Sequence, residues 1–130
     1  MINISYGELR IKEILEREGV TFKPQLSFQD LRSDANRRLR FDFGIFKHNK
    51  LVFIIEYDGI QHIRPVKQFG GEAAYNIQIE HDRRKNKYCS HHSIPLHRIL
   101  YSDYVFLEKI VLELLSIYNI IEQNEVENER

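Results

Sequence analysis

The sequence predicts an α/β fold in which a mixed four-stranded sheet is flanked by helices. Short runs rich in Val, Ile and Phe recur in the first half of the chain and once more in its last third, which is typical of β-strands. Apolar residues at helical spacing occur near both ends, and a more polar helical stretch lies between them. Helices before, between and after the strands favour a mixed sheet.

The first element is expected to be a helix over residues 5–18. Its apolar residues recur at i, i+3 and i+4, and Gly19 follows as a helix stop. Ser5 and Glu8 match a capping box, in which the Ser5 side chain caps the helix and Glu8 reaches back to the Ser5 amide. This pattern gives Glu8 a structural role that requires no ligand.

Three strands are expected next. The first covers residues 21–28 with a kink at Pro24, and the polar residues 29–38 are expected to form a long loop or an irregular arm. Two further strands, 40–46 and 51–58, flank a hydrophilic turn and therefore predict a hairpin.

The second half of the chain begins with a loop over residues 63–71, where Pro and Gly interrupt any periodicity. Residues 72–90 are expected to form a helix with few apolar side chains, and residues 94–100 a fourth strand. A last helix, capped by Ser102 and extending to about Glu122, carries an apolar stripe with helical period and should cover one face of the sheet.

The length and composition bound the class of protein. The 130 residues suit one domain over residues 1–121, followed by an acidic tail over residues 122–130 that is expected to fray. The formal net charge is zero, but basic residues outnumber acidic ones once this tail is set aside. No apolar run approaches the roughly 20 residues that span a bilayer, and the N-terminus shows no export signal. We therefore expect no membrane association and a cytoplasmic location.

Three acidic residues stand where the predicted strands should be apolar. Asp42 lies inside the second strand, and Glu56 and Asp58 end the third, where strand alternation places both on one face. Burying a carboxylate without a partner costs several kcal/mol, so converging carboxylates would need a cation, and such oxygen-rich sites suit Mg²⁺ or Mn²⁺. The alternative is that these carboxylates lie at strand ends and point into solvent.

The run Ile55–His62 resembles the E-x-D-G-x-Q-H signature of the phage-type branch of the PD-(D/E)XK nuclease superfamily. That branch is related to the very short patch repair endonucleases and to the EDxHD homing endonucleases. The resemblance extends over about residues 5–101, through the stretches 69–72, 81–89 and 96–99. It implies an αβββαβ core and a metal-dependent endonuclease that hydrolyses DNA phosphodiester bonds in a bacterial or phage-infected cell.

The resemblance also assigns roles at the site. Asp42 and Glu56 would be the primary metal ligands together with the Tyr57 carbonyl, and Asp58 would be either a ligand or a base. A glutamate on the first helix of related nucleases makes Glu8 a candidate for binding a metal-linked water.

The lysine of the superfamily pattern is missing, because its position holds Asp58. His62 is the natural substitute as a general acid or base, and Gln61 would orient the attacking water or a phosphate oxygen. Lys85 on the following helix would supply the absent positive charge.

The helix over residues 72–90 carries a polar stripe that includes Gln78, Asp82 and Lys85. This stripe faces either solvent or the catalytic cleft. The resemblance to the nuclease family favours the cleft. Arg98 in the fourth strand either pairs with a buried acid or marks an edge of the sheet.

Basic residues near the acids would meet DNA phosphates. The candidates are Arg37, Arg38, Arg40, Arg64, Lys67 and Arg84. No recognition helix is evident, so any sequence specificity would come from a homodimer or a partner protein. Two other interpretations stay open: a nucleic-acid-binding module whose nuclease site has decayed, and a small phage interaction protein on the same scaffold.

Overall fold

The computed structural model describes residues 5–60 and 63–122. Gln61 and His62, both candidate catalytic residues, and residues 123–130 of the acidic tail lie outside the described residues. In the described part of the chain the elements are, in order, α1 (Tyr6–Arg17), β1 (Thr21–Arg32), β2 (Arg38–Lys47), β3 (Lys50–Asp58), a 3₁₀ helix (Lys67–Phe69), α2 (Gly71–His91), β4 (Leu96–Leu100), a second 3₁₀ helix (Tyr101–Phe106) and α3 (Leu107–Ile117).

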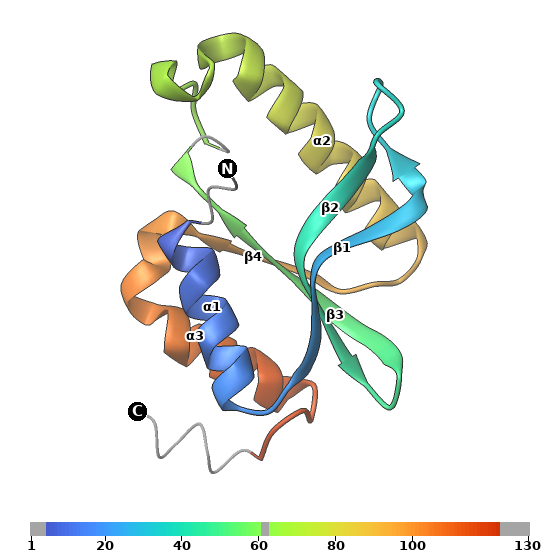
Figure 1. Cartoon of the computed structure of the whole chain (residues 1–130), viewed down its shortest axis with the longest axis vertical. Coiled ribbons are helices and arrows are strands. Elements are labelled where there is room, and N and C mark those ends of the chain that lie inside the picture. The colour runs from blue at the N-terminus through green and yellow to red at the C-terminus, as the bar shows by residue number, and fades with distance from the viewer. Residues whose placement is uncertain (1–4, 61–62, 123–130) are drawn as a thin grey trace.

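The strands form one mixed sheet in the order β1-β2-β3-β4, which confirms the predicted fold class. β1–β2 and β2–β3 are antiparallel, whereas β4 returns parallel to β3 after the α2 crossover. Figure 1 shows α1 and α3 together on one side of the sheet and α2 on the other. In residues 5–60 and 63–122 no helix is long and apolar enough to cross a membrane.

Two apolar clusters hold these layers together. The cluster beneath α1 and α3 joins both helices to the inner residues of β2, β3 and β4, and its largest fully buried side chain is Phe53. The cluster beneath α2 is smaller and contains Phe41, Ile54 and the α2 residue Cys89.

The sheet forks at Asp42. The β2–β3 ladder ends at the pair Phe43–Ile55, although both strands continue. Beyond that point the start of β2 pairs only with β1, and the end of β3 pairs only with β4 among the described strands. The two halves diverge, with α2 lying across their open end (Figure 1). We call the β1–β2 half, residues 26–41, the arm.

A backbone distortion accompanies the fork. Gln25 lies opposite Asp42, between the pairs Pro24–Phe43 and Leu26–Phe41, and has a φ of 54° in the left-handed region. Such a conformation costs a non-glycine residue about 1 kcal/mol or more. The expected kink of the first strand therefore falls one residue after Pro24. It lets Phe41 and Phe43, which a regular strand would place on one face, enter different core clusters.

The predicted boundaries of the first strand and the last helix were wrong, and the fourth strand begins at Leu96 and not at residue 94. The first strand does not end at residue 28: β1 continues to Arg32, and only residues 33–37 form the turn before β2. Leu31 and Leu39 are buried beneath α2, and the Arg32 guanidinium donates hydrogen bonds to the carbonyl oxygens of Gln29 and Asn36. These contacts convert the expected loop into the outer half of the arm.

The last helix also differs from the prediction. Ser102 does not cap it, because residues 101–106 form a 3₁₀ helix and α3 begins at Leu107. It ends at Ile117 rather than near residue 122, since Asn119 adopts a φ of 59° and the chain turns there. The first helix was predicted correctly, with Ser5 as its N-cap and Gly19 at a φ of 67° after its end.

Candidate active site

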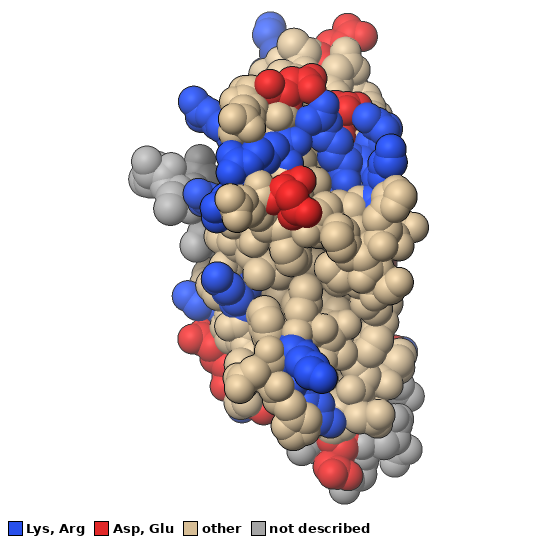
Figure 2. Space-filling model, turned by 90° about the vertical axis from the view of Figure 1, so that its right-hand side faces the viewer, with Lys and Arg blue, Asp and Glu red and all other residues tan. Residues whose placement is uncertain are grey.

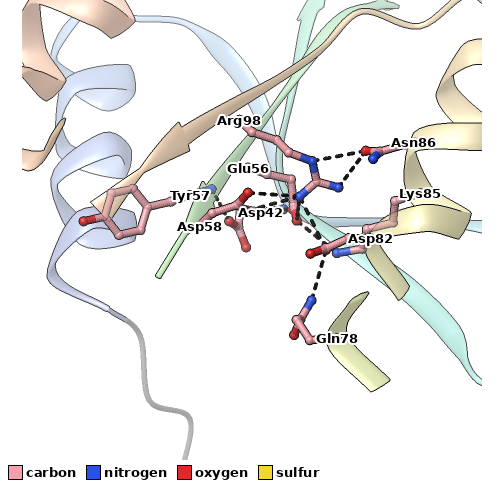
Figure 3. A network of polar contacts seen from close by, with 9 residues as sticks. All are labelled: Asp42, Glu56, Tyr57, Asp58, Gln78, Asp82, Lys85, Asn86 and Arg98. Carbon is pink, nitrogen blue, oxygen red and sulfur yellow. Dashed lines mark hydrogen bonds and ion pairs between the residues drawn. The ribbon is translucent and has the colours of Figure 1, made fainter. Parts of the chain in front are cut away.

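Two carboxylates occupy the fork where the β2–β3 ladder stops. The Asp42 Oδ2 atom accepts a hydrogen bond of 2.7 Å from the Tyr57 backbone N–H. The Glu56 Oε1 atom accepts one of 2.6 Å from the Asp42 backbone N–H. Each acid thus bonds the backbone of the opposite strand in place of a ladder hydrogen bond, which holds the two carboxylates side by side (Figure 3).

Burial and the nearby carboxylates raise the pKa of Asp42 to about 8. Burial is the largest cause, followed by the negative charges of Glu56 and Glu8; the Tyr57 N–H and Lys85 act in the opposite direction. Glu8 therefore lies near enough to influence Asp42, while its own backbone N–H is capped by the Ser5 hydroxyl at 3.1 Å. The raised pKa means that the uncharged form of Asp42 is favoured beside Glu56.

Lys85 enters this site from α2. Its Nζ lies 3.0 Å from Glu56 Oε2, and the residue is only 7% exposed. The ammonium also lies 5.3 Å from the centre of the Phe41 ring, within the range of a cation–π contact. The polar stripe of this helix therefore turns Lys85 into the protein and not into solvent.

Arg98 is the residue that joins the acids of β3 to those of α2. One guanidinium nitrogen, Nη1, lies 3.2 Å and 3.3 Å from the two oxygens of Asp58 and 3.4 Å from Asp82 Oδ1. Its Nε and Nη2 atoms donate to Asn86 Oδ1 at 3.1 Å and 2.9 Å. Gln78 completes the group by donating to Asp82 at 3.0 Å (Figure 3).

Two members of this network were not chosen as site residues from the sequence. The sequence left open whether Arg98 pairs with an acid or marks a sheet edge, and both are true, since β4 is an edge strand. The signal was a lone charge inside an apolar strand. Asn86 gave no signal, because its role depends on the distance between α2 and β4.

One of the basic residues predicted to contact DNA is engaged within the protein, and the others are exposed. Arg84 is engaged within the protein: it donates to the Arg32 carbonyl at 2.7 Å, pairs with Glu80 at 2.9 Å and pairs with Asp34. It therefore ties the arm to α2. The other candidates are exposed, either on the arm and its turn or before α2: Arg37, Arg38, Arg40, Arg64 and Lys67. Figure 2 shows that Lys and Arg side chains gather over the upper part of the face that the arm and α2 form.

The acids of the site differ in how far the protein already engages their oxygens. Asp42 Oδ1 accepts no hydrogen bond from residues 5–60 or 63–122, whereas both oxygens of Glu56 are engaged and Asp58 is held by Arg98. In the described ranges no group of three or more His, Cys, Asp and Glu side chains is arranged so that it could hold a metal ion. Asp42, through its open oxygen, is thus the acid that could most readily contact a cation, whereas Glu56 beside it is paired with Lys85.

Comparison with family models, with curated proteins and with solved structures finds no match for this chain.

Proposed function

We propose that this protein is a Mg²⁺- or Mn²⁺-dependent endonuclease of the PD-(D/E)XK type that hydrolyses DNA phosphodiester bonds. One observation carries the proposal: Asp42 and Glu56 are held together at the fork, where burial and, second, charge repulsion raise the pKa of Asp42 to about 8. Two adjacent buried carboxylates repel each other when both are ionised, and a bound cation would offset that repulsion.

The residues of the fork would divide the work of hydrolysis. A bound divalent ion lowers the pKa of its water and polarises the phosphate. Asp42 would bind the ion, and Glu56 would do so after partial release of Lys85. The Lys85 ammonium, 3.0 Å from Glu56, takes the place of the missing superfamily lysine and would offset the charge that develops on the phosphate.

The remaining candidates have roles that follow from their positions. Asp58, oriented by Arg98, would act as a ligand or as a base for the attacking water. Glu8 would bind a water from α1, and Gln61 and His62, which follow β3 in the chain, would orient and protonate the reacting oxygens. DNA phosphates would meet the exposed basic residues of the arm.

The test is a cleavage assay on supercoiled plasmid and on labelled oligonucleotides with Mg²⁺, Mn²⁺ or EDTA. We expect cleavage with either metal and none with EDTA. Asp42→Asn and Glu56→Gln should each slow cleavage by about 100-fold or more, since the lost charge stabilisation amounts to several kcal/mol.

Glu16→Gln is the matched control, because Glu16 is an exposed acid on α1 away from the fork; it should cut at the parental rate. Equal cleavage rates for all three variants and the parent would disprove the site assignment.

A second candidate is a nucleic-acid-binding or phage interaction module on an inactive nuclease scaffold. It is favoured by the pairing of Glu56 with Lys85 and of Asp58 with Arg98, because these contacts neutralise two of the acids without an ion. Calorimetric titration with Mg²⁺ separates the candidates: the enzyme binds the ion in a manner that Asp42→Asn abolishes, and the module releases no such heat. An interaction module would also lack DNA affinity at every salt concentration.

The proposal also includes a cellular location and a source of sequence specificity. The enzyme would act in the cytoplasm of a bacterial or phage-infected cell, and a homodimer or a partner protein would supply sequence specificity.

A further inference from the structure

A groove with aromatic walls lies on the other side of β3 from the acids. It has a volume of about 510 Å³, and its lining includes aromatic rings from four segments of the chain: Tyr6, Tyr57, Phe69, Tyr101 and Tyr104. This volume falls within the roughly 300–1,000 Å³ of small-molecule sites and is therefore suited to one or a few nucleotides.

The groove shares a strand with the candidate active site. Tyr57 stands between Glu56 and Asp58, and the N–H of the same residue binds Asp42. Its side chain points away from the acids toward α1, as Figure 3 shows. Gly7 permits this position, because a Cβ there would lie 2.1 Å from the Tyr57 ring. A ligand that contacts the Tyr57 ring would therefore lie close to the acidic fork, because Tyr57 is flanked in the chain by Glu56 and Asp58.

The rings around the groove are exposed to an unusual degree. Tyr6 is 83% exposed, Phe69 53% and Tyr104 44%. Single exposed aromatics are ordinary, but several that surround one groove indicate a binding site for flat apolar groups. The described lining contains no charged side chain, so the groove suits bases and not phosphates. Arg64 and Lys67, exposed in the segment that leads to Phe69, are placed for the phosphates.

We propose that this groove stacks unpaired nucleobases beside the scissile phosphate, so that the preferred substrate has a single-stranded segment. Stacking on aromatic rings requires bases that are free of their own helical stack. The inference rests on the proposed nuclease function for its ligand class, and it adds a preference for single strands, flaps or frayed ends over intact duplex.

The test measures binding in EDTA, where no hydrolysis occurs. Fluorescence anisotropy would compare a labelled single strand with a strand of equal length made of stable abasic units, which keeps the phosphates and lacks the bases. We expect the natural strand to bind at least about 5-fold tighter, because stacking contributes about 1–3 kcal/mol per base, or about 5- to 150-fold. Quenching of 2-aminopurine in the strand would report stacking directly.

Variants locate the effect. Tyr6→Ala and Phe69→Ala should each weaken binding of the natural strand by about 5-fold or more and leave binding of the abasic strand unchanged. Phe106→Ala is the matched control, since Phe106 is 56% exposed and lies outside the groove lining; it should bind like the parent.

Equal affinity for the two strands, or unchanged base-dependent binding in both groove variants, would overturn the proposal. So would a concentration-dependent dimer in sedimentation that Tyr6→Ala abolishes, because a second copy would then occupy the groove. Base-dependent binding by a protein that cuts nothing in Mg²⁺ would support the groove and remove the hydrolytic function.

Discussion

The two faces of the sheet differ in what they bury, and one strand supplies both. Along β3, Phe53, Ile55 and Tyr57 point into the apolar cluster beneath α1 and α3. The alternate positions Glu56 and Asp58 carry buried charges toward α2, at 2% and 5% exposure. Because successive side chains of a strand point to opposite faces, β3 presents one face that stabilises the fold and another that carries candidate catalytic residues.

The comparison shows that the faces respond to change in different ways. On the apolar face each side chain contributes its own burial, so the cost of a substitution depends mainly on volume. On the α2 face the charges satisfy one another, so removing one member leaves its partner buried and unpaired. The cost there depends on which partner is left.

The largest expected effect is on the charged face. Lys85→Met should reduce the free energy of unfolding by about 3–5 kcal/mol, because Glu56 loses its buried cation. Urea unfolding measures this change. The double variant Lys85→Met/Glu56→Gln should recover most of the loss. Lys87→Met, on an exposed position of the same helix, is the control; a double variant no more stable than Lys85→Met would show that charge pairing is not the cause.

A substitution in the core of the apolar face should reduce the free energy of unfolding by a similar amount, and no second substitution of a charged residue should restore it. Leu112 is 1% exposed in α3, and Leu112→Ala should cost about 2–5 kcal/mol through lost burial and a cavity. Urea unfolding at two pH values checks that the cost does not depend on pH. Ile117→Ala, at a 69% exposed position of α3, should change stability by less than about 0.5 kcal/mol. Equal costs at the two positions would contradict the assignment of this face.

The fork should make its own contribution to the pH dependence of stability. The pKa of Asp42 is about 8 in the folded protein and near 3.8 otherwise, so the folded state holds a proton that the unfolded state releases between these values. The stabilisation is present below pH 4 and is lost as the pH rises toward 8, with a slope of up to about 1.4 kcal/mol per pH unit.

Asp42→Asn should remove that slope, and saturating Mg²⁺ should flatten it in the parent because a cation favours the ionised carboxylate. Urea unfolding from pH 4 to pH 8 measures both effects. Identical pH profiles for parent and variant would show that Asp42 is ionised throughout this range.

The smallest effect concerns how the helices begin. α1 is capped by the Ser5 side chain, whereas Phe106, at the N-cap position before α3, makes no side-chain cap hydrogen bond. Ser5→Ala should therefore cost about 1 kcal/mol, and Ser102→Ala less than about 0.5 kcal/mol. Thermal unfolding distinguishes the two. A larger loss of stability for Ser102→Ala than for Ser5→Ala would indicate that Ser102 caps the last helix, as the sequence pattern predicts.

Local patterns in the sequence were sufficient for most of the fold. Alternation along β3 placed Glu56 and Asp58 on one face, and helical spacing found α1 and α3, because both patterns depend only on neighbouring residues. The error at residues 29–32 arose where a strand is defined by pairing across a turn. The missed Asn86 and the undecided Arg98 depend on contacts between separate elements, which no local pattern encodes.

By itself, the sequence determined the α/β class, the facing of the acids and their resemblance to a nuclease motif. The tertiary structure alone decided three things: where the β2–β3 ladder stops, that Lys85 and Arg98 meet the acids, and that aromatic rings from four segments surround one groove. The physical reason is that periodicity is set by backbone geometry within one element. Register, the depth of the fork and the approach of α2 are set by packing and charge pairing between residues distant in the chain.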